Sequence, residues 1–297
     1  MIFAGPSGVG KRTLAILLAE FLNCASPLQD DACGVCPSCR KILLRTHPDI
    51  REIQPDGSFI KIEQIRALIG EIAYKPFEAR YRVAILDGAE QMRQEAANSL
   101  LKTLEEPPSQ SIIILVTTNP HALLGTIRSR ARLIQFGGIP AGQIESYLQQ
   151  GQGMNPEEAR LAALFSQGSL EAALSFNSGK FQETRSLALR FVTLLATNKS
   201  FVEASALAAE LAKDKEKFEL WLDATEAILQ DLYYAHMEPS RIGQVDILEN
   251  LTSLARTTPR GVIVSATKAL AELRSDLLHN VQRQIALESL YLREISH

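Results

Sequence analysis

The chain has 297 residues, of which 46% are hydrophobic and 22% charged, and its formal net charge is -3. The length allows two or three domains, and the composition is that of an ordinary globular protein. A chain without net positive charge is not, as a whole, a nucleic-acid-binding surface. No signal-peptide pattern precedes the first apolar segment, and no apolar run approaches the ~20 residues that span a membrane. We therefore expect a cytoplasmic protein without a membrane partner.

The first motif is a phosphate loop over residues 5–13, between a short apolar strand at 2–4 and a helical pattern from about residue 11 to 23. Strand, glycine-rich turn and helix are the context in which such a loop binds phosphate. The glycines let successive N–H groups point at one anion, and the helix N-terminus and a lysine add positive charge. The expected nucleotide- or phosphate-binding residues are Gly5, Gly8, Gly10, Lys11, Thr13 and Asp87.

The residue after the lysine departs from the usual pattern. A Ser or Thr normally stands there and holds Mg²⁺ with its hydroxyl, but this chain has Arg12, and Thr13 comes one position late. An arginine cannot ligate Mg²⁺ and repels it. The sequence therefore predicts a nucleotide-shaped loop without its metal ligand. Two interpretations stay open: a loop that binds phosphate, as ATP or ADP, without magnesium, and a loop kept only for fold stability.

Four cysteines follow the first helix, in the spacing C-x8-C-x2-C-x2-C over residues 24–39. Thiolates two residues apart bend around one ion, and four of them complete the tetrahedral shell that structural zinc prefers. The alternative, free thiols packed as small apolar groups, fits poorly with the Gly, Pro and Ser between them. We expect a structural Zn²⁺ site formed by Cys24, Cys33, Cys36 and Cys39, and a turn role rather than a ligand role for His47.

Strand and helix patterns then alternate up to residue 136, which predicts a parallel sheet covered on both faces. The carboxyl ends of its strands meet at one edge, where ligands bind. The phosphate loop, Asp87 and Thr117 all come to that edge and predict one site. The expected strands are 50–53, 81–86, 111–116 and 133–136, and the expected helices are 62–72, 94–105 and 121–130.

After Gly137-Gly138-Ile139-Pro140 the pattern is helical, with Asn155 as a helix cap. The last segment, 262–292, has the periodicity of one extended helix. We divide the chain into a phosphate-loop core at 1–138 with the cysteine module at 24–39, a helical lid at 139–178 and a helical domain at 179–297.

Five motifs together resemble the delta-prime subunits of the bacterial DNA polymerase III clamp loader, a family within the AAA+ proteins. They are the loop at 5–13, the four cysteines, Ile60–Arg66, the run Val83–Glu90 with Glu95–Pro108, and Thr126–Ala131. The resemblance covers about residues 1–178. It implies an AAA+ α/β domain with an inserted zinc module, a small lid and a C-terminal collar. It also implies partners: tau/gamma motor subunits, a delta subunit, the sliding clamp and, through the complex, primed DNA.

In this family a Ser-Arg-Cys motif supplies an arginine to the neighbour's ATP. The corresponding residues are Ser129 and Arg130, followed by Ala131 in place of Cys. The chemistry needs only the guanidinium, which neutralises charge on the transferred phosphoryl group. The alternative is that the arginines of this segment form a solvated face. The resemblance implies that Arg130 is an arginine finger acting in trans.

Three departures argue against hydrolysis in the chain's own loop. Arg12 replaces the magnesium hydroxyl, Gly88 stands after Asp87 where an acid is expected, and Glu171 stands where the motor subunits of the family carry an arginine. We expect Glu90, two residues further on, not to replace the missing acid. The chain is therefore predicted to be a non-hydrolysing clamp-loader subunit. Two alternatives are an active tau/gamma-type ATPase and a zinc-dependent DNA-binding protein.

Overall fold

The computed structural model describes residues 1–197, 200–277 and 281–295. The chain forms two compact units, which we treat separately. The first comprises Met1–Pro140 and Gly168–Glu171, and the second comprises Ala141–Gln167 and Ala172–His297. Among the described residues, no helix is long and apolar enough to cross a membrane.

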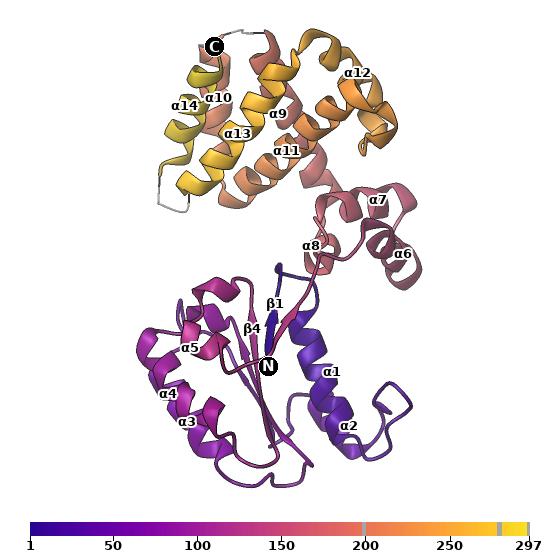
Figure 1. Cartoon of the computed structure of the whole chain (residues 1–297). Coiled ribbons are helices and arrows are strands. Elements are labelled where there is room, and N and C mark those ends of the chain that lie inside the picture. Colours follow the sequence, from indigo (N-terminus) through magenta and orange to yellow (C-terminus); the bar gives the residue numbers. More distant parts are fainter. Residues whose placement is uncertain (198–199, 278–280, 296–297) are drawn as a thin grey trace. The chain divides into compact units, whose positions relative to one another are not determined.

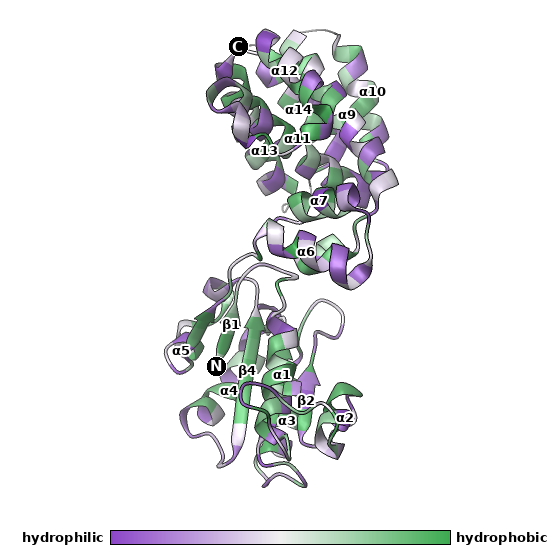
Figure 2. Ribbon diagram, turned by 90° about the vertical axis from the view of Figure 1, so that its right-hand side faces the viewer, coloured by the Kyte–Doolittle hydropathy of each residue, from purple (hydrophilic) through white to green (hydrophobic). Residues whose placement is uncertain are grey.

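The first unit contains a five-stranded sheet in which all paired strands are parallel (Figure 1). Its strands are near-continuous apolar runs, as expected when both faces of a sheet are covered, and they are coloured largely as hydrophobic in Figure 2. In spatial order the strands are β2 (Ile50–Ile53), β3 (Arg82–Asp87), β4 (Ser111–Thr117), β1 (Ile2–Ala4) and β5 (Leu133–Gln135).

Helices cover both faces of this sheet (Figure 1). Alternate residues of β3 show the two sides: Ala84 and Leu86 belong to one apolar cluster, and Val83 and Ile85 to another. The first cluster is completed by α3 (Ile62–Ile72), α4 (Gln94–Glu105) and α5 (Gly125–Arg128), and the second by α1 (Lys11–Asn23), next to which lies α2 (Pro37–Leu43). The parallel α/β core predicted from the sequence is therefore confirmed.

In the first unit, the predicted helix and strand boundaries agree closely with the structure, except between residues 121 and 130. There the structure has a 3₁₀ turn, Pro120–Ala122, followed by extended residues and the short helix α5 instead of one helix. Asn119 accepts a hydrogen bond from the His121 N–H and closes a tight turn at once. Gly125, a poor helix residue, then begins α5 without a side-chain cap. The prediction of one continuous helix at 121–130 is wrong for these local reasons.

The second unit is entirely helical in the part of the chain that is described. Its central apolar cluster includes the aromatic side chains of Phe191, Phe218, Trp221 and Tyr291. Asn155 caps α7 by accepting a hydrogen bond from the Glu157 N–H, as predicted. The helices are α6 (Ala141–Gln152), α7 (Pro156–Phe165), α8 (Leu170–Leu174, which begins in the first unit), α9 (Ser178–Thr197), α10 (Phe201–Leu211), α11 (Lys215–Met237), α12 (Leu248–Thr257), α13 (Arg260–Leu277) and α14 (Arg283–Ile295).

The expected single helix over 262–292 is wrong. Helix α13 ends at Leu277 and α14 begins at Arg283, with Val281 and Gln282 outside any helix; residues 278–280 of the predicted helix lie outside the described part of the chain. The break lets both segments bury apolar side chains in one core, since Leu273 of α13 and Leu290 of α14 belong to the same cluster. A straight helix of that length would extend about 46 Å and place its ends far apart. The division into lid and collar domains stays a prediction.

Candidate functional site

The phosphate loop has the conformation that its glycines predict. Gly5, Gly8 and Gly10 all have positive φ angles, of +154°, +71° and +90°. A Cβ on Gly5 would lie 2.3 Å from the carbonyl oxygen of Phe136, and one on Gly8 would lie 2.0 Å from Ser169 Oγ. Both positions therefore require glycine for space as well as for backbone geometry.

The side chain of Lys11 folds back onto the carbonyl groups of the loop. Its side chain is buried, and its Nζ donates hydrogen bonds to the carbonyl oxygens of Gly5 at 2.8 Å and Pro6 at 2.5 Å. Burial lowers the pKa of Lys11, while the carboxylates of Glu90 and Asp87 oppose that shift. Two of the three N–H donors of the ammonium are used in this way, and one is left for an anion in the loop.

Arg12 occupies the space between two carboxylates at the carboxyl ends of the strands. Its Nη2 lies 2.5 Å and its Nε 3.0 Å from Glu52 Oε2, and its Nε lies 3.6 Å from Asp87 Oδ2. Arg45 also pairs with Glu52, at 3.1 Å. The guanidinium therefore neutralises carboxylates that a divalent cation would otherwise need. Thr13 is exposed, and its side chain makes no hydrogen bond to any described residue, so its hydroxyl is not brought to these groups.

Glu52 was missed by the sequence analysis, which treated it only as part of a strand. Its role depends on the pairing of β2 with β3, in which Glu52 stands beside Ile85, two residues before Asp87. There was no clear signal in the sequence, because two of the four residues of this strand, Arg51 and Glu52, are charged.

Glu90 follows Gly88 in a 3₁₀ turn and is hydrogen-bonded to Thr118, just after the end of β4. Gly88 has a φ of +76° and starts a 3₁₀ turn, so the strand does not continue through it. The Glu90 carboxylate accepts hydrogen bonds from the N–H of Thr118 at 3.1 Å and from its hydroxyl at 2.5 Å. Burial opposes ionisation of Glu90, but these hydrogen bonds hold its pKa below the usual value.

The segment Gly168–Glu171 lies directly against the phosphate loop. The Glu171 N–H donates to the carbonyl oxygen of Gly8 at 3.3 Å, and Glu171 Cβ lies 2.9 Å from the position that a Gly8 Cβ would take. The family's motor subunits carry a cation at this place in the sequence. Here an acidic side chain starts beside the loop.

Arg130 lies at the surface of the first unit, just after α5. Its Nε donates to Glu105 Oε1 at 2.7 Å, and its Nη2 lies 2.5 Å from the same oxygen. Its Nη1 donates to the carbonyl oxygen of Thr126 at 2.9 Å and to Ser129 Oγ at 3.2 Å. Among the described residues, no hydrogen bond or ion pair joins Arg130 to the phosphate loop. Glu105 was not singled out from the sequence.

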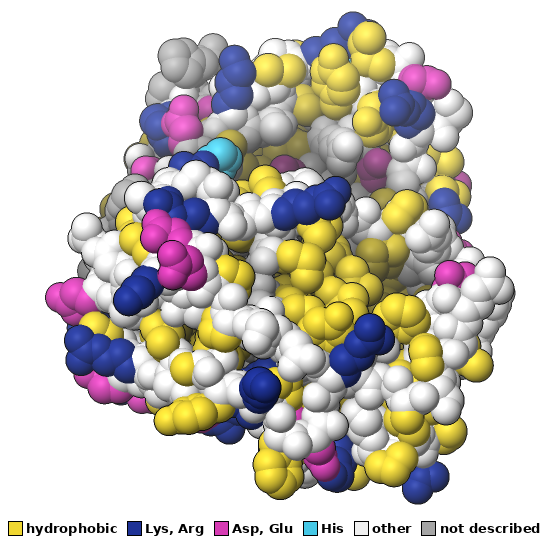
Figure 3. Space-filling view, turned by 60° about the horizontal axis from the view of Figure 1, so that its bottom comes forward, with side chains coloured by type: hydrophobic (Ala, Val, Ile, Leu, Met, Phe, Trp, Pro, Cys, Tyr) yellow, Lys and Arg dark blue, Asp and Glu magenta, His cyan; other side chains and the backbone are white. Residues whose placement is uncertain are grey.

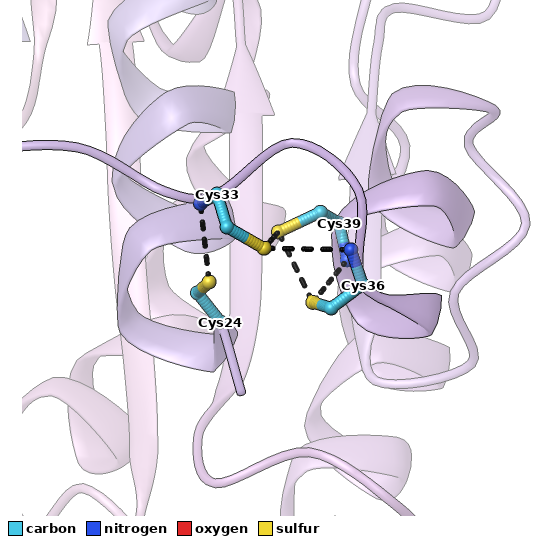
Figure 4. Close-up of side chains that lie close together, drawn as sticks. All are labelled: Cys24, Cys33, Cys36 and Cys39. Atoms are coloured by element: carbon cyan, nitrogen blue, oxygen red, sulfur yellow. Dashed lines mark hydrogen bonds between the residues drawn. The ribbon is translucent and has the colours of Figure 1, made fainter. Parts of the chain in front are cut away.

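The four cysteines converge, as the spacing predicts (Figure 4). Their sulfurs all lie within 4.8 Å of one another, and none forms a disulfide. Cys24 follows the end of α1, while Cys36 caps the start of α2 and Cys39 lies in its first turn. Four sulfurs around one zinc ion lie about 3.8 Å apart, given Zn–S bonds of ~2.3 Å. The arrangement is one that can hold a tetrahedral metal ion.

Backbone N–H groups point at three of these sulfurs, and the first such bond runs from Cys33 N to Cys24 Sγ at 3.3 Å. Cys36 N donates to Cys33 Sγ at 3.4 Å, and Cys39 N donates to Cys36 Sγ at 3.5 Å. Backbone hydrogen bonds lower the pKa of Cys33, and they lower that of Cys36 to about 6. Burial raises the pKa of the Cys39 thiol. A bound cation would compensate that last effect by stabilising the charged form.

His47 is a turn residue, as expected. Its buried ring accepts a hydrogen bond from the Asp49 N–H at Nδ1, at 3.2 Å, and burial lowers its pKa. Asp49, which the sequence analysis did not single out, is completely buried. It accepts hydrogen bonds from the backbone N–H groups of residues 77–79 and from Arg82. This carboxylate stabilises the loop that precedes β3.

Comparison with known proteins gives relatives of one kind. Residues 1–140 match the family described as DNA polymerase III, delta subunit. The chain is 30% identical over 296 residues to the DNA polymerase III subunit delta' of Bacillus subtilis (strain 168), which covers 98% of this chain and 89% of that protein. It is also 30% identical over 318 residues to the subunit tau of Escherichia coli (strain K12), over 49% of that longer protein. A solved structure, a gamma subunit-related protein from Thermotoga maritima, aligns with a TM-score of 0.47 at 21% identity and covers 99% of this chain and 93% of that one.

Proposed function

Because this chain belongs to the family of DNA polymerase III delta' subunits, we propose that it is a clamp-loader subunit that does not hydrolyse ATP in its own phosphate loop. It instead completes the ATP site of a neighbouring motor subunit with Arg130. The observation that carries the first half is the position of Arg12, whose guanidinium pairs with Glu52 and approaches Asp87.

The loop lacks the parts that hydrolysis needs. A motor requires Mg²⁺ on a loop hydroxyl and an acid that orients water, with positive charge near the γ-phosphate. Arg12 replaces the hydroxyl, Gly88 replaces the acid after Asp87, and one oxygen of the Glu90 carboxylate is held by the hydroxyl of Thr118. In the segment Gly168–Glu171, which lies against the loop, the charged side chain is that of Glu171, and it is negative. Binding of ATP or ADP without hydrolysis remains compatible with the glycines and Lys11.

Arg130 is suited to act on a neighbour's nucleotide. It is at the surface, and its guanidinium is permanently charged and can donate to two phosphate oxygens at once. Such arginines accelerate hydrolysis by roughly 10³–10⁵ in other nucleotide hydrolases. The partners would be tau/gamma-type motor subunits and a delta subunit, and the assembly would place the sliding clamp on primed DNA.

The four cysteines would hold one structural Zn²⁺ in the same subunit. All four places of the tetrahedron are taken by sulfur, so no position remains for a reacting water. The ion would therefore stabilise the connection between α1 and α2 and take no part in the ATP chemistry.

The first test uses the chain reconstituted with motor subunits, clamp and primed DNA. Arg130→Ala is expected to abolish ATP turnover at the one motor site that this chain completes, while circular dichroism and assembly stay unchanged. Arg128→Ala is the matched control, since Arg128 precedes the same turn and its described contact is with the His121 ring. Unchanged turnover with Arg130→Ala would refute the trans role. Magnesium-dependent ATPase from the isolated chain would instead favour the tau/gamma-type motor.

The third candidate, a zinc-dependent DNA-binding protein, has little support. Among the described residues on the face shown in Figure 3, Lys and Arg side chains are scattered singly, with hydrophobic side chains gathered between them. Phosphate-backbone binding needs a continuous basic surface. DNA binding by the isolated chain that disappears when residues 24–39 are removed would revive this candidate.

A further inference from the structure

The carboxylate of Glu105 holds Arg130 against the chain's own surface. Both guanidinium nitrogens on one side of Arg130, Nε and Nη2, contact the same oxygen, Glu105 Oε1, at 2.7 and 2.5 Å. The third nitrogen, Nη1, donates to Thr126 O and Ser129 Oγ. All three nitrogens are therefore engaged within the chain.

This arrangement leaves too few donors for a phosphate. A guanidinium has five N–H groups, and bidentate binding of phosphate needs two that point in parallel. The described contacts use the Nε–H, one N–H of Nη2 and both of Nη1, which leaves one N–H on Nη2. Arg130 therefore cannot bind a phosphate bidentately until one of its present partners leaves.

The charge of Glu105 makes it the partner that must leave. A carboxylate in direct contact with the guanidinium cancels much of the positive charge that would stabilise a developing phosphoryl anion. Thr126 O and Ser129 Oγ are neutral and can stay. An arginine finger that is still paired with a carboxylate would stabilise the phosphoryl anion only weakly.

The position of Glu105 makes this pair easy to open. Glu105 is the last residue of α4, and a negative charge at a helix C-terminus is unfavourable. About half of its side chain is exposed (48%), as is a third of the Arg130 side chain (34%), and exposed ion pairs contribute little to stability. Glu105 has no other described partner, whereas Arg130 would gain a more highly charged anion in exchange.

We propose that Glu105 is a latch for Arg130: it holds the guanidinium retracted in the free chain, and the phosphate of a neighbour's nucleotide displaces it on assembly. Glu105 is thus a positioning residue that acts through Arg130. The inference rests on the proposed function of Arg130.

The test is Glu105→Gln in the reconstituted complex with motor subunits, clamp and primed DNA, under conditions of saturating assembly. Glutamine keeps the shape and one hydrogen bond but removes the charge that competes with phosphate. We expect kcat for ATP to rise about two- to fivefold. This factor corresponds to the free energy that an exposed ion pair typically contributes. KM for ATP should stay within about twofold, because ATP is bound by the motor's own loop.

Two further variants make the result decisive. Glu106→Gln makes the same change of charge next to the latch, at an exposed carboxylate without a described ion pair, and should leave kcat unchanged. In the double variant with Arg130→Ala, the effect of Glu105→Gln should vanish, because the latch has nothing left to hold.

A kcat that falls or does not change with Glu105→Gln would overturn the latch, provided that Arg130→Ala lowers it. A fall would show that Glu105 orients the finger, and no change would show that the pair is only a surface contact. If Arg130→Ala itself has no effect, the proposed function fails, and the two failures are thus told apart.

Discussion

Arg12 and Arg130 both pair with a glutamate in the first unit, yet the two regions differ in how firmly the pair is closed. Glu52, the partner of Arg12, is 17% exposed in its side chain and is shared with Arg45, and Asp87 stands nearby. Glu105 is 48% exposed, and within the described part of the chain its side chain pairs with Arg130 alone. The pair of Arg130 with Glu105 is therefore the easier of the two to open, as the proposed latch requires. Burial of the carboxylate and the number of its partners determine how easily each ion pair opens.

The two glutamates are each paired with an arginine of the chain, whereas the four cysteine sulfurs are not paired with a described Lys or Arg. No described ion pair or hydrogen bond joins their sulfurs to a Lys or Arg, although backbone N–H groups favour thiolates at Cys33 and Cys36. We expect one Zn²⁺ per chain and a large loss of stability in Cys36→Ser, since structural zinc contributes on the order of 10 kcal/mol to its module. A colorimetric zinc assay with proteolysis around residues 24–39 measures both effects. Zinc-free native protein with the same protease resistance would contradict the prediction.

The ion pair of Asp49 with Arg82 is more deeply buried than either of these arginine–glutamate pairs. Asp49 is completely buried and accepts three backbone hydrogen bonds besides the pair with Arg82, whose side chain is 12% exposed. Asp49→Asn should destabilise the first unit by about 3 kcal/mol, because it leaves a largely buried guanidinium unpaired. Urea unfolding measures this. The control is Asp30→Asn, at an exposed aspartate without a described partner, which should change stability little.

The same carboxylate sets a pH dependence. Although burial opposes ionisation, the hydrogen bonds from residues 77–79 and Arg82 lower the pKa of Asp49 to about 2. Because the folded pKa lies below the unfolded value near 4, its contribution is fully present above pH 4 and is lost as the pH falls toward 2. Stability measured from pH 6 to pH 2 should decline less steeply in Asp49→Asn. Parallel curves for the two proteins would contradict this account.

Arg12→Ala tests the ion pair of Arg12 with Glu52, which is partly exposed. Of the substitutions Cys36→Ser, Asp49→Asn and Arg12→Ala, we expect this one to lower the stability least. We expect a loss of about 1 kcal/mol, since Arg45 still neutralises Glu52. ATP turnover of the reconstituted complex should not change, and Arg12→Ser should not create a motor, because Gly88 still lacks the acid. Magnesium-dependent turnover by isolated Arg12→Ser would show that Arg12 alone keeps the loop inactive. Glu105→Gln should unfold at the same urea concentration as the parent chain.

Local patterns determined a large part of this protein. Near-continuous apolar runs predicted the strands of the parallel sheet, because strands covered on both faces have no polar side. The glycines of the phosphate loop and the spacing of the cysteines predicted local geometry, since each motif is formed within about 16 residues of chain. The missing metal ligand at Arg12 and the candidate finger at Arg130 could also be read from sequence position.

Only the tertiary structure decided what those arginines contact. Glu52 reaches Arg12 across 40 positions of sequence through the pairing of β2 with β3, and Glu105 reaches Arg130 across 25 through the packing of α4 beside α5. The break between α13 and α14 has the same origin, because it is set by the shared apolar core and not by helical periodicity. Periodicity and motifs record what each segment does locally, whereas the partner of a charge is chosen by which segments the fold brings together.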